Sequence, residues 1–389
     1  MPVPSCQRRL PIVGVGGRLL AILAGLLIFG LAHANPLLDG LEAALPLYRE
    51  LADDSKTQAA WSETLPPPDK PGSRKLEPGK PWAGLALLIR RLAILGDLPA
   101  DTETPPRYEG KVVDGIIAFQ RRHGLDPDGV IGRETLAQLN IAPALRVRQI
   151  ELNIERLKQL PHVPRRLLVN VPEFVLRAFE QDEEKLRMRI IVGNALKTRT
   201  TLFVADMRFI EFSPYWNVPP SIARKETIPK LRSDPAYFDD QGFEFYSRAG
   251  GIDSTLSEEN LAAVLEGRMR IRQRPGPKNA LGGIKFVFPN HDNIYLHHTP
   301  AVRLFDKARR DFSHGCIRVE EPLALAQFVL ANQPEWDEER IKAAMAKGVS
   351  ATLRLREDLP VVIAYLTALV GDDGRVRFFP DLYRLDGIQ

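Results

Sequence analysis

Apolar side chains in the first part of the chain recur at the three- and four-residue spacing of helices. This pattern predicts helices at 35–61, 85–95, 112–119 and 133–139. The second and third end at Gly96 and at His123-Gly124, and the fourth follows the turn-forming run at 126–129. Prolines and a glycine interrupt any regular pattern between about 62 and 81, so a linker or extended loop is expected there.

From about residue 165 the pattern changes to that of strands. Candidate strands lie at 167–171, 175–179, 186–192, 203–212, 284–288, 294–296, 351–355 and 376–379. The turn-like run at 181–184 predicts a hairpin between the second and third of them. Proline and glycine clusters bound a different segment, at about 214–282, in which two short helices are expected. Such an insertion is either a lid over a site or a packed subdomain that never moves.

With 389 residues, 44% of them hydrophobic, the chain can bury a sizeable core, and two domains are expected. The predicted fold class is α+β. A mainly-β domain occupies 165–389, with the inserted segment at 215–282. A small three-helix domain occupies 84–141, after a helical and linker segment at 35–83.

The amino terminus has the features of a secretory signal peptide, expected to span residues 1–34. Arginines precede an apolar run at 19–32, and Ala32-His33-Ala34 fits a cleavage site. A spanning helix needs about 20 apolar residues, so cleavage is favoured over an uncleaved membrane anchor. No later segment is long and apolar enough to span a bilayer. The mature chain is therefore expected to be exported, with no stable membrane span.

The charge balance argues against a nucleic-acid partner. Lys and Arg total 53 and Asp and Glu total 49, giving +4, and three of the positive charges lie in the predicted signal peptide. The remaining chain is close to neutral. It shows no long run of charge and no basic stripe with interleaved aromatic residues.

Reactive side chains concentrate near the second of the two cysteines. Cys6 lies in the predicted signal peptide, whereas Cys316 lies close in sequence to four of the seven histidines: His291, His297, His298 and His314. One remaining thiol in an exported chain cannot form an internal disulfide, so its presence needs another explanation. Its neighbours Ser, His, Gly and Arg suit a reactive group better than a packed core. Because thiolates attack and imidazoles accept protons, Cys316 is a candidate nucleophile.

Residues 84–141 resemble the peptidoglycan-binding module found in many cell-wall enzymes. In this segment Gly129 and Gly132 allow a tight turn between short helices, and Phe119 with the leucines forms a small core. A generic helical bundle without a ligand is the alternative, because a fold does not prove that glycan binding survives. The residues that carry the resemblance are 118–125, 128–132, 135–136 and 139–140.

The runs Tyr295-Leu296-His297 and Ser313-His314-Gly315-Cys316, with Arg318, resemble the signature of L,D-transpeptidases, the penicillin-insensitive cross-linking enzymes of peptidoglycan. The resemblance covers about 165–389 and includes the runs at 216–220 and 276–282. It is closest to the large periplasmic branch, which carries an inserted capping segment and a peptidoglycan-binding module. It implies a periplasmic, wall-associated protein whose partners are peptidoglycan stem peptides and glycan strands. Other cell-wall synthesis enzymes are further candidate partners, and no cofactor or metal is implied.

The resemblance also implies roles at the site. Cys316 is the nucleophile, attacking the carbonyl between the third and fourth residues of a stem peptide. His297 removes the thiol proton and later protonates the leaving amine. Backbone N–H groups around His314, Gly315 and Cys316 hold the developing oxyanion. Arg318 holds a stem carboxylate through a bidentate contact.

Several of these roles have structural alternatives. Arg318 is either a substrate ligand or the partner of Glu320 or Glu321 in an ion pair. His314 either tunes the thiol or, like Ser313, shapes the loop, and Trp216 is either a substrate contact or ordinary core. The expected substrate-binding residues are Arg318, Ser313, Tyr295, Trp216 and Asn217.

One position departs from the pattern of this branch. Relatives usually carry an acidic residue directly after the catalytic histidine, and here that residue is His298. Adjacent side chains on a strand point to opposite faces, so His298 need not touch the nucleophile. The change puts the support of His297 and the pH profile in doubt more than the reaction itself.

The implied reaction is acyl transfer through a thioester on Cys316, with release of the terminal D-alanine. The side-chain amine of a neighbouring diaminopimelate then attacks, which links two third residues. Water as acceptor gives an L,D-carboxypeptidase instead, and a lipoprotein lysine gives anchoring to the wall.

Two alternatives change the class of protein. A zinc hydrolase built from His297 or His298, His314 and Cys316 is disfavoured, because adjacent histidines on a strand cannot easily face one ion. No His-Glu-x-x-His motif is present either. An inactive wall-binding scaffold would use only 84–141. Labelling of Cys316 by a carbapenem would argue against a scaffold, because such compounds trap the family's thiol.

Overall fold

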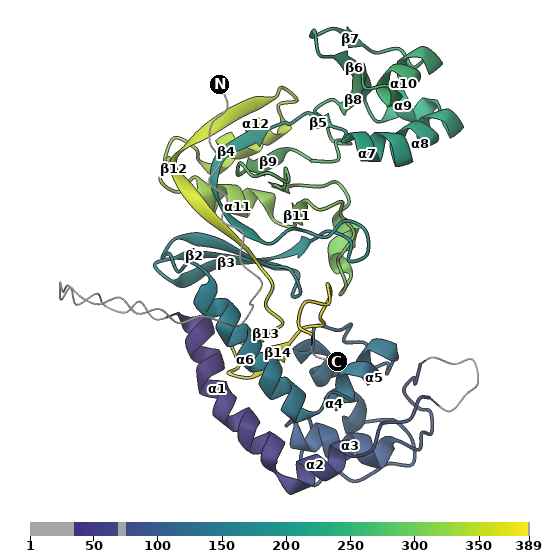
Figure 1. Ribbon diagram of the computed structural model, residues 1–389, viewed down its shortest axis with the longest axis vertical. Coiled ribbons are helices and arrows are strands. Elements are labelled where there is room, and N and C mark those ends of the chain that lie inside the picture. The colour runs from purple at the N-terminus through teal and green to yellow at the C-terminus, as the bar shows by residue number, and fades with distance from the viewer. Residues whose placement is uncertain (1–34, 69–74, 388–389) are drawn as a thin grey trace, which may run out of the picture.

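The protein has the predicted α+β fold. A computed structural model describes residues 35–68 and 75–387, so the predicted signal peptide lies outside the described residues. Helices gather at one end, a β-barrel forms the middle, and a smaller lobe projects from the barrel at the other end (Figure 1). No helix in the two described ranges combines the length and the apolar character needed to cross a bilayer.

The helical end contains the helices that were predicted at 35–61, 85–95, 112–119 and 133–139. The helices that precede the barrel in the described residues are α1 (Pro36–Asp53), α2 (Ser55–Trp61), α3 (Leu85–Ile94), α4 (Lys111–Arg122), α5 (Arg133–Leu139) and α6 (Pro143–Gln159). The segment predicted as helical at 35–61 is divided at Asp54, whose carboxylate accepts the N–H of Thr57 at 2.8 Å and caps α2. Helix α6 was not predicted, because Arg146, Gln149 and Asn153 share its buried side with apolar residues.

Helices α3, α4 and α5 enclose the expected small core, in which Phe119 is fully buried. The turn before α5 depends on Gly129. Its φ is +70°, and a Cβ there would lie 2.9 Å from Val113, so only glycine fits. The matching expectation for Gly132 was wrong, because that residue is extended and has open space around it.

Eight strands close the barrel in the order β1-β12-β4-β9-β10-β11-β3-β2. Their bounds are β1 Arg166–Asn170, β2 Val175–Glu180, β3 Glu183–Ile191, β4 Phe203–Phe212, β9 Ile284–Val287, β10 Leu296–His297, β11 Ile317–Val319 and β12 Ala351–Ala364. The predicted hairpin joins β2 and β3. Strand β12 is 14 residues long and continues well past the predicted segment, because its charged stretch at 356–358 hides the alternation. Strand β11 was not predicted, since three residues are too few to show a period.

The barrel is filled by side chains from neighbouring strands. Ile210, Phe286, Leu296 and Ile317 are paired in turn across β4, β9, β10 and β11, and all belong to one buried core. Helices α11 (Pro322–Val329) and α12 (Glu338–Ala346) contribute to the same core. Because successive side chains of a strand alternate in direction, the residues flanking this row point out of the barrel.

The insertion between β4 and β9 folds as a lobe with its own core, centred on Leu231, Phe245 and Ile271. It contains a four-stranded sheet in the order β5-β8-β6-β7, which was not predicted because its strands are short or rich in charged residues. The elements are β5 Trp216–Asn217, α7 Pro220–Ile222, the π-helical turn η1 Ala223–Thr227, α8 Ile228–Ser233, α9 Ala236–Asp240, β6 Phe243–Ser247, β7 Ile252–Asp253, α10 Glu258–Leu265 and β8 Met269–Gln273. We call residues 215–282 the cap lobe.

The chain after β12 joins the barrel to the helical end. Strands β13 (Ala368–Val370) and β14 (Val376–Phe378) form a hairpin that shares a core with α1 and α6. On β14, the Phe378 ring lies 5.7 Å from the ring of His123 on α4 and 4.4 Å from the guanidinium of Arg146 on α6. The last described residues then return to the barrel, where they reach the functional site.

Candidate active site

Two adjacent parallel strands bring the reactive residues together. Strand β10 pairs with β11 so that Leu296 lies opposite Ile317, and both side chains point into the barrel core. The residues on either side of this pair therefore point out of the barrel on a common face. Those neighbours are Tyr295, His297, Cys316 and Arg318.

The imidazole of His297 is held in one orientation and kept neutral. The side chain is buried, with 5% of its surface exposed, and Nδ1 lies 2.6 Å from the carbonyl oxygen of His298. This contact places the proton on Nδ1 and leaves Nε2 with a free lone pair. Burial, with a smaller contribution from Arg318, lowers the pKa of His297 to about 3. The ring is therefore neutral at pH 7 and able to accept a proton.

Cys316 carries a free, half-buried thiol. Its Sγ lies 3.7 Å from the carbonyl oxygen of Asn293. Burial raises the pKa of the Cys316 thiol, although the backbone N–H and phenol of Tyr295 and the charges of Lys285 and Arg318 oppose that rise. The resting thiol is consequently protonated at neutral pH, and a base must remove its proton before it can attack.

Tyr295 lies against both the His297 imidazole and the Cys316 thiol. Its ring lies edge-on to the His297 ring, with centroids 5.6 Å apart. Burial and the neighbouring Cys316 raise the pKa of its phenol, so this group stays protonated and can donate a hydrogen bond. Lys285 Nζ lies 4.5 Å from the centre of the same ring.

A polar row crosses the sheet at this point, parallel to the apolar row inside the barrel. Glu211, Lys285, His297 and Arg318 are successive neighbours on β4, β9, β10 and β11. Lys285 forms an ion pair with Glu211 at 3.1 Å. Neither residue was singled out from the sequence. The available signal was the alternation Ile284-Lys285-Phe286 within the predicted strand, which turns Lys285 outward.

Arg318 does not form the ion pair considered as its alternative role. Glu320 instead accepts the guanidinium Nε–H of Arg189 at 2.9 Å. In the described part of the chain Arg318 makes no salt bridge, and its buried Nε atom has no hydrogen-bond partner. Burial also lowers its pKa. A half-buried arginine whose Nε–H has no partner in the protein favours binding of an anionic group from outside it.

Ser313 makes two hydrogen bonds within the loop before β11. Its hydroxyl donates to the carbonyl oxygen of Cys316 and accepts the N–H of Gly315 at 3.1 Å. Gly315 has φ of +117°, a conformation that favours glycine. Because its N–H is already engaged within the loop, Gly315 is not a free donor for an oxyanion. The N–H groups of His314 and Cys316 have no hydrogen-bond acceptor among the described residues.

The loop also depends on two residues that sequence reasoning missed. The hydroxyl of Thr200 donates to the carbonyl oxygen of Gly315 at 2.8 Å. The hydroxyl of Tyr383, from the end of the chain, accepts the N–H of Thr200 at 3.1 Å and donates to the carbonyl oxygen of Gly193 at 2.8 Å. No sequence pattern could reveal contacts between residues 183 positions apart.

The cap lobe reaches the same loop through one polar contact. His314 Nε2 lies 2.7 Å from Glu226 Oε1, and Glu226 belongs to the π-helical turn of the lobe. Both side chains are about half exposed. Trp216 packs partly buried against the core of the lobe, and Asn217 is exposed beside it. Neither residue forms a hydrogen bond with the Cys316 loop in the described residues.

His298 takes a role of its own, on the other side of the strand from His297. Its Nδ1 accepts the N–H of Gly283 at 3.2 Å. A Cβ on Gly282 would lie only 2.2 Å from that ring, so the ring packs directly on the glycine backbone. Burial lowers the pKa of His298 and keeps its ring a hydrogen-bond acceptor. It therefore receives a backbone N–H, as a carboxylate at this position also could.

Other parts of the molecule offer less chemistry. The described residues contain no group of three or more His, Cys, Asp or Glu side chains that could hold a metal ion.

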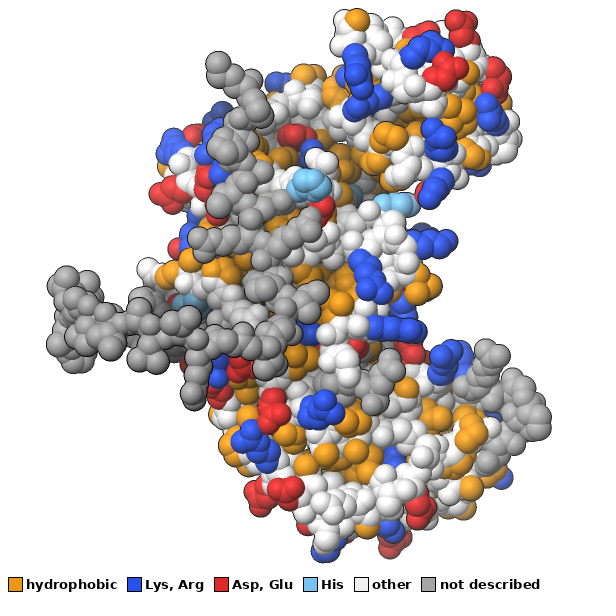
Figure 2. All heavy atoms as spheres, in the orientation of Figure 1, with side chains coloured by type: hydrophobic (Ala, Val, Ile, Leu, Met, Phe, Trp, Pro, Cys, Tyr) orange, Lys and Arg blue, Asp and Glu red, His pale blue; other side chains and the backbone are white. Residues whose placement is uncertain are grey.

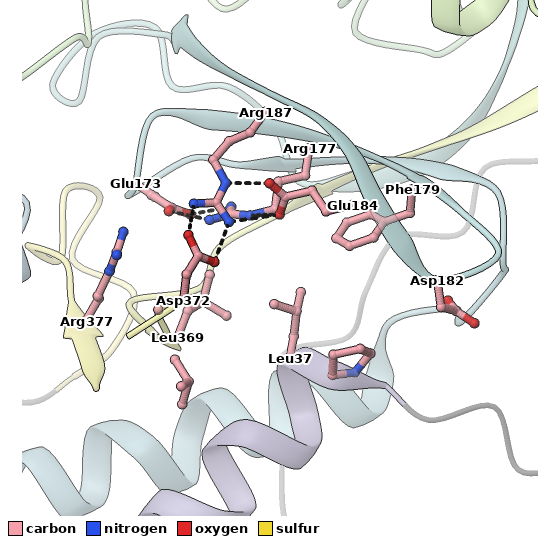
Figure 3. A pocket seen from close by; sticks show the side chains of 13 residues that line it. Leu37, Glu173, Arg177, Phe179, Asp182, Glu184, Arg187, Leu369, Asp372 and Arg377 are labelled. Atoms are coloured by element: carbon pink, nitrogen blue, oxygen red, sulfur yellow. Dashed lines mark hydrogen bonds and ion pairs between the residues drawn. The ribbon is translucent and has the colours of Figure 1, made fainter. Parts of the chain in front are cut away.

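A cavity of about 330 Å³ opens between α1, the β2–β3 hairpin and the β13–β14 hairpin (Figure 3). Arg177 pairs there with Glu173 at 2.6 Å, and Arg187 pairs with Asp372 at 3.0 Å. The cavity contains none of the residues predicted from the sequence.

Comparisons with known proteins find matches for both the barrel segment and the helical segment of the chain. Residues 164–363 match the family described as the L,D-transpeptidase catalytic domain, and residues 84–139 match the one described as a peptidoglycan binding domain. A curated protein of Haemophilus influenzae named as an L,D-transpeptidase is 30% identical over 239 residues. That alignment covers 61% of this chain and 48% of the relative, so the chain spans about half the length of the curated relative it matches.

Two crystal structures of L,D-transpeptidases also align with the chain. The structure from Xylanimonas cellulosilytica is 13% identical, covering 76% of this chain and 100% of that one, with a TM-score of 0.21. The structure from Stackebrandtia nassauensis is 11% identical, covering 75% and 95%, with a TM-score of 0.28. Both overlay loosely, and family membership rests on the matches in sequence.

Proposed function

Because this chain belongs to the L,D-transpeptidase family, we propose that it cross-links peptidoglycan stem peptides through a thioester on Cys316. The observation that carries the proposal is the common outward face of β10 and β11. There a protonated thiol and a neutral imidazole with a free Nε2 point out of the barrel together. A nucleophile that holds its proton and a base that can accept one are the two groups that acyl transfer requires.

In the first half-reaction His297 Nε2 takes the thiol proton while Sγ attacks the carbonyl between the third and fourth stem residues. The His298 carbonyl, which holds Nδ1–H, stabilises the imidazolium that forms. The free N–H groups of His314 and Cys316 are the candidate donors for the oxyanion. As the C–N bond breaks, the imidazolium protonates the leaving amine, and D-alanine departs.

In the second half-reaction the amine of a neighbouring diaminopimelate attacks the thioester carbonyl. His297 accepts a proton from this amine, the C–S bond breaks, and the imidazolium returns that proton to the thiolate. The product is a link between two third residues. Arg318 is the proposed ligand for a stem carboxylate, because its half-buried side chain has no ion-pair partner in the described residues and its Nε–H makes no hydrogen bond there.

The remaining substrate contacts are proposed with the domain boundaries. Tyr295 orients the thiol and the imidazole, Ser313 and Gly315 shape the loop, and Trp216 with Asn217 lines the approach from the cap lobe.

We place the catalytic domain at 165–389, the cap lobe insertion at 215–282 and the wall-binding domain at 84–141. With residues 1–34 as a signal peptide and 35–83 as a connecting segment, the proposed location is the periplasm, at the cell wall.

Mass spectrometry of the reaction products tests the function. The full mature chain is incubated with a disaccharide-tetrapeptide beside the Cys316→Ala variant. Dimers that lack one D-alanine, absent with the variant, are the expected products. Tripeptide without dimers would identify an L,D-carboxypeptidase or an enzyme that uses another acceptor. A reduced thiol with no Cys316-dependent product would contradict the proposal and favour the wall-binding scaffold.

A further inference from the structure

Positive charge that is dispersed in the sequence gathers beside the catalytic loop. Two surface segments, 196–199 and 302–312, contain six cations and two acids, although residues 35–389 carry only +1 in total. Figure 2 shows Lys and Arg side chains gathered at the edge of the barrel that faces the helical end. The charged residues of the two segments are Lys197, Arg199, Arg303, Asp306, Lys307, Arg309, Arg310 and Asp311.

Hydrogen bonds from the residues just before the first segment hold it beside the second. The N–H of Ala195 donates to the carboxylate of Asp311 at 3.0 Å, and the N–H of Val192 donates to the carbonyl oxygen of Arg310 at 2.9 Å. The first segment is also tied to the catalytic loop, because Thr198 Oγ1 donates to the carbonyl oxygen of Ser313 at 2.9 Å. We call the joined segments the basic rim.

The acids of the basic rim neutralise it only in part. Asp311 is buried and pairs with Arg309 at 2.7 Å, whereas Asp306 is 3.6 Å from Arg189, which lies outside the two segments. In contrast, Lys197, Arg303 and Lys307 are exposed and form no salt bridge within the described residues. The charge that the basic rim presents to solvent is therefore positive.

Apolar side chains are exposed among these cations. Leu196, Val302 and Phe312 are 85%, 55% and 43% exposed, and they are three of the seven large apolar residues exposed in the described residues. Exposed apolar side chains that gather within one surface region mark interaction sites more often than ones scattered singly. Cations mixed with apolar groups fit a ligand that bears both carboxylates and methyl groups, as the alanine-containing peptide stems of the wall polymer do.

The basic rim also reaches the helical end of the molecule. Arg309 Nη1 lies 3.7 Å from Glu134 Oε1 on helix α5, inside the segment that matches the peptidoglycan binding family. The surface therefore runs from the catalytic loop to the wall-binding domain without a break in the fold. This continuity favours the wall polymer over an anionic membrane as the ligand.

We propose that the basic rim binds the carboxylate-bearing peptide stems of the wall polymer between the wall-binding domain and Cys316. This inference rests on the proposed function, which it deepens. The basic rim would act on the intact polymer and leave a small soluble substrate unaffected, because such a substrate needs only the site itself. Its contribution is electrostatic, so it should weaken as salt screens the charges.

A charge-reversed variant tests the proposal in the full mature chain. Lys197→Glu, Arg303→Glu and Lys307→Glu are combined, and co-sedimentation with purified wall sacculi is measured at low and at high salt. At low salt we expect binding to weaken by about fivefold or more, with less dependence on salt than in the wild type. Release of D-alanine from a soluble disaccharide-tetrapeptide should remain at the wild-type rate.

A matched control carries the same change of charge elsewhere. Arg248→Glu, Arg270→Glu and Lys347→Glu alter three exposed cations outside the basic rim, and this variant should bind sacculi as the wild type does. Equal binding by both variants, or equal losses in both, would overturn the proposal. So would a basic-rim variant that loses binding to phosphatidylglycerol-containing vesicles but keeps its binding to sacculi. Failure of the proposed function would appear separately, as no turnover of the soluble substrate by the wild type.

Discussion

The two strands that carry the reactive side chains differ from the loop that precedes the nucleophile. On β10 and β11 the outward direction of His297 and Arg318 follows from strand alternation and from the buried pair Leu296 and Ile317. The loop at 313–315, which sets the position of Cys316, has no such local constraint. It is held by Thr200, by the carboxyl-terminal Tyr383 through Thr200, and by Glu226 of the cap lobe.

This difference separates the identity of the reacting groups from their placement. The barrel fixes which side chains face outward, so their chemistry can be inferred from a short stretch of sequence. The placement of the thiol and of the oxyanion donors depends on residues far along the chain. Substitutions of the reacting side chains should therefore remove the chemistry, whereas substitutions of the residues that hold the loop should weaken it by degrees.

The largest effect is expected for the reacting thiol itself, in Cys316→Ala. Release of D-alanine should fall by more than about a thousandfold, because no other thiol in the described residues can form the thioester. The melting temperature should change little, since the side chain is small and only half-buried. Residual turnover near the wild-type rate would show that another group is the nucleophile.

On the loop side, Thr200→Val should slow turnover by roughly ten- to a hundredfold. The variant loses the bond to the carbonyl oxygen of Gly315 and leaves that buried acceptor unsatisfied, which costs about 1–3 kcal/mol. Thr200→Ser keeps the hydroxyl and should restore most of the rate. Measuring kcat and KM for both variants, with their melting temperatures, separates loop placement from loss of fold. Equal rates in the two variants would contradict the placement role.

A smaller effect is expected on the stability of the fold at low pH. The pKa of His297 in the folded protein lies far below its unfolded value of about 6.5. A depressed pKa means that the neutral ring stabilises the fold above about pH 6.5, and that this contribution is lost as the pH falls below it. His297→Gln should therefore lose less thermal stability between about pH 7 and pH 4.5 than the wild type does. His291→Gln, at an exposed position, is the control and should behave as the wild type.

The smallest effect is expected at the contact between the loop and the cap lobe. Glu226→Gln should change turnover by no more than about fivefold, because a half-exposed polar contact between two side chains contributes at most about 1 kcal/mol. The effect should diminish as salt is added. Steady-state rates at two ionic strengths test this prediction. A loss of a hundredfold or more would mean that Glu226 acts in the chemistry itself.

Much of the fold was accessible from the sequence because periodicity and turn residues are local signals. The helices around Phe119, the β2–β3 hairpin and the strand at 203–212 were predicted for that reason and are confirmed. Helix α6 was missed because polar residues line its buried face. The sheet of the cap lobe was missed because its strands are short or highly charged.

The residues of the candidate site also differ in whether the sequence alone could predict them. Cys316 and His297 stood out through their residue types and spacing. Lys285 was visible only as one outward position of a strand, and Thr200 and Tyr383 carried no signal. Their roles arise when distant segments fold together, which is information that a single sequence does not display locally.

Intact-mass measurement of the acyl-enzyme tests most directly the claim that a neutral His297 activates a protonated Cys316. Wild type and His297→Gln are each mixed with the disaccharide-tetrapeptide. The reactions are quenched at intervals, and the intact mass of the protein is measured. The account predicts a thioester adduct on the wild type that forms at least about a hundredfold more slowly on the variant. Equal rates of adduct formation would contradict it, because the thiol would then lose its proton without this base.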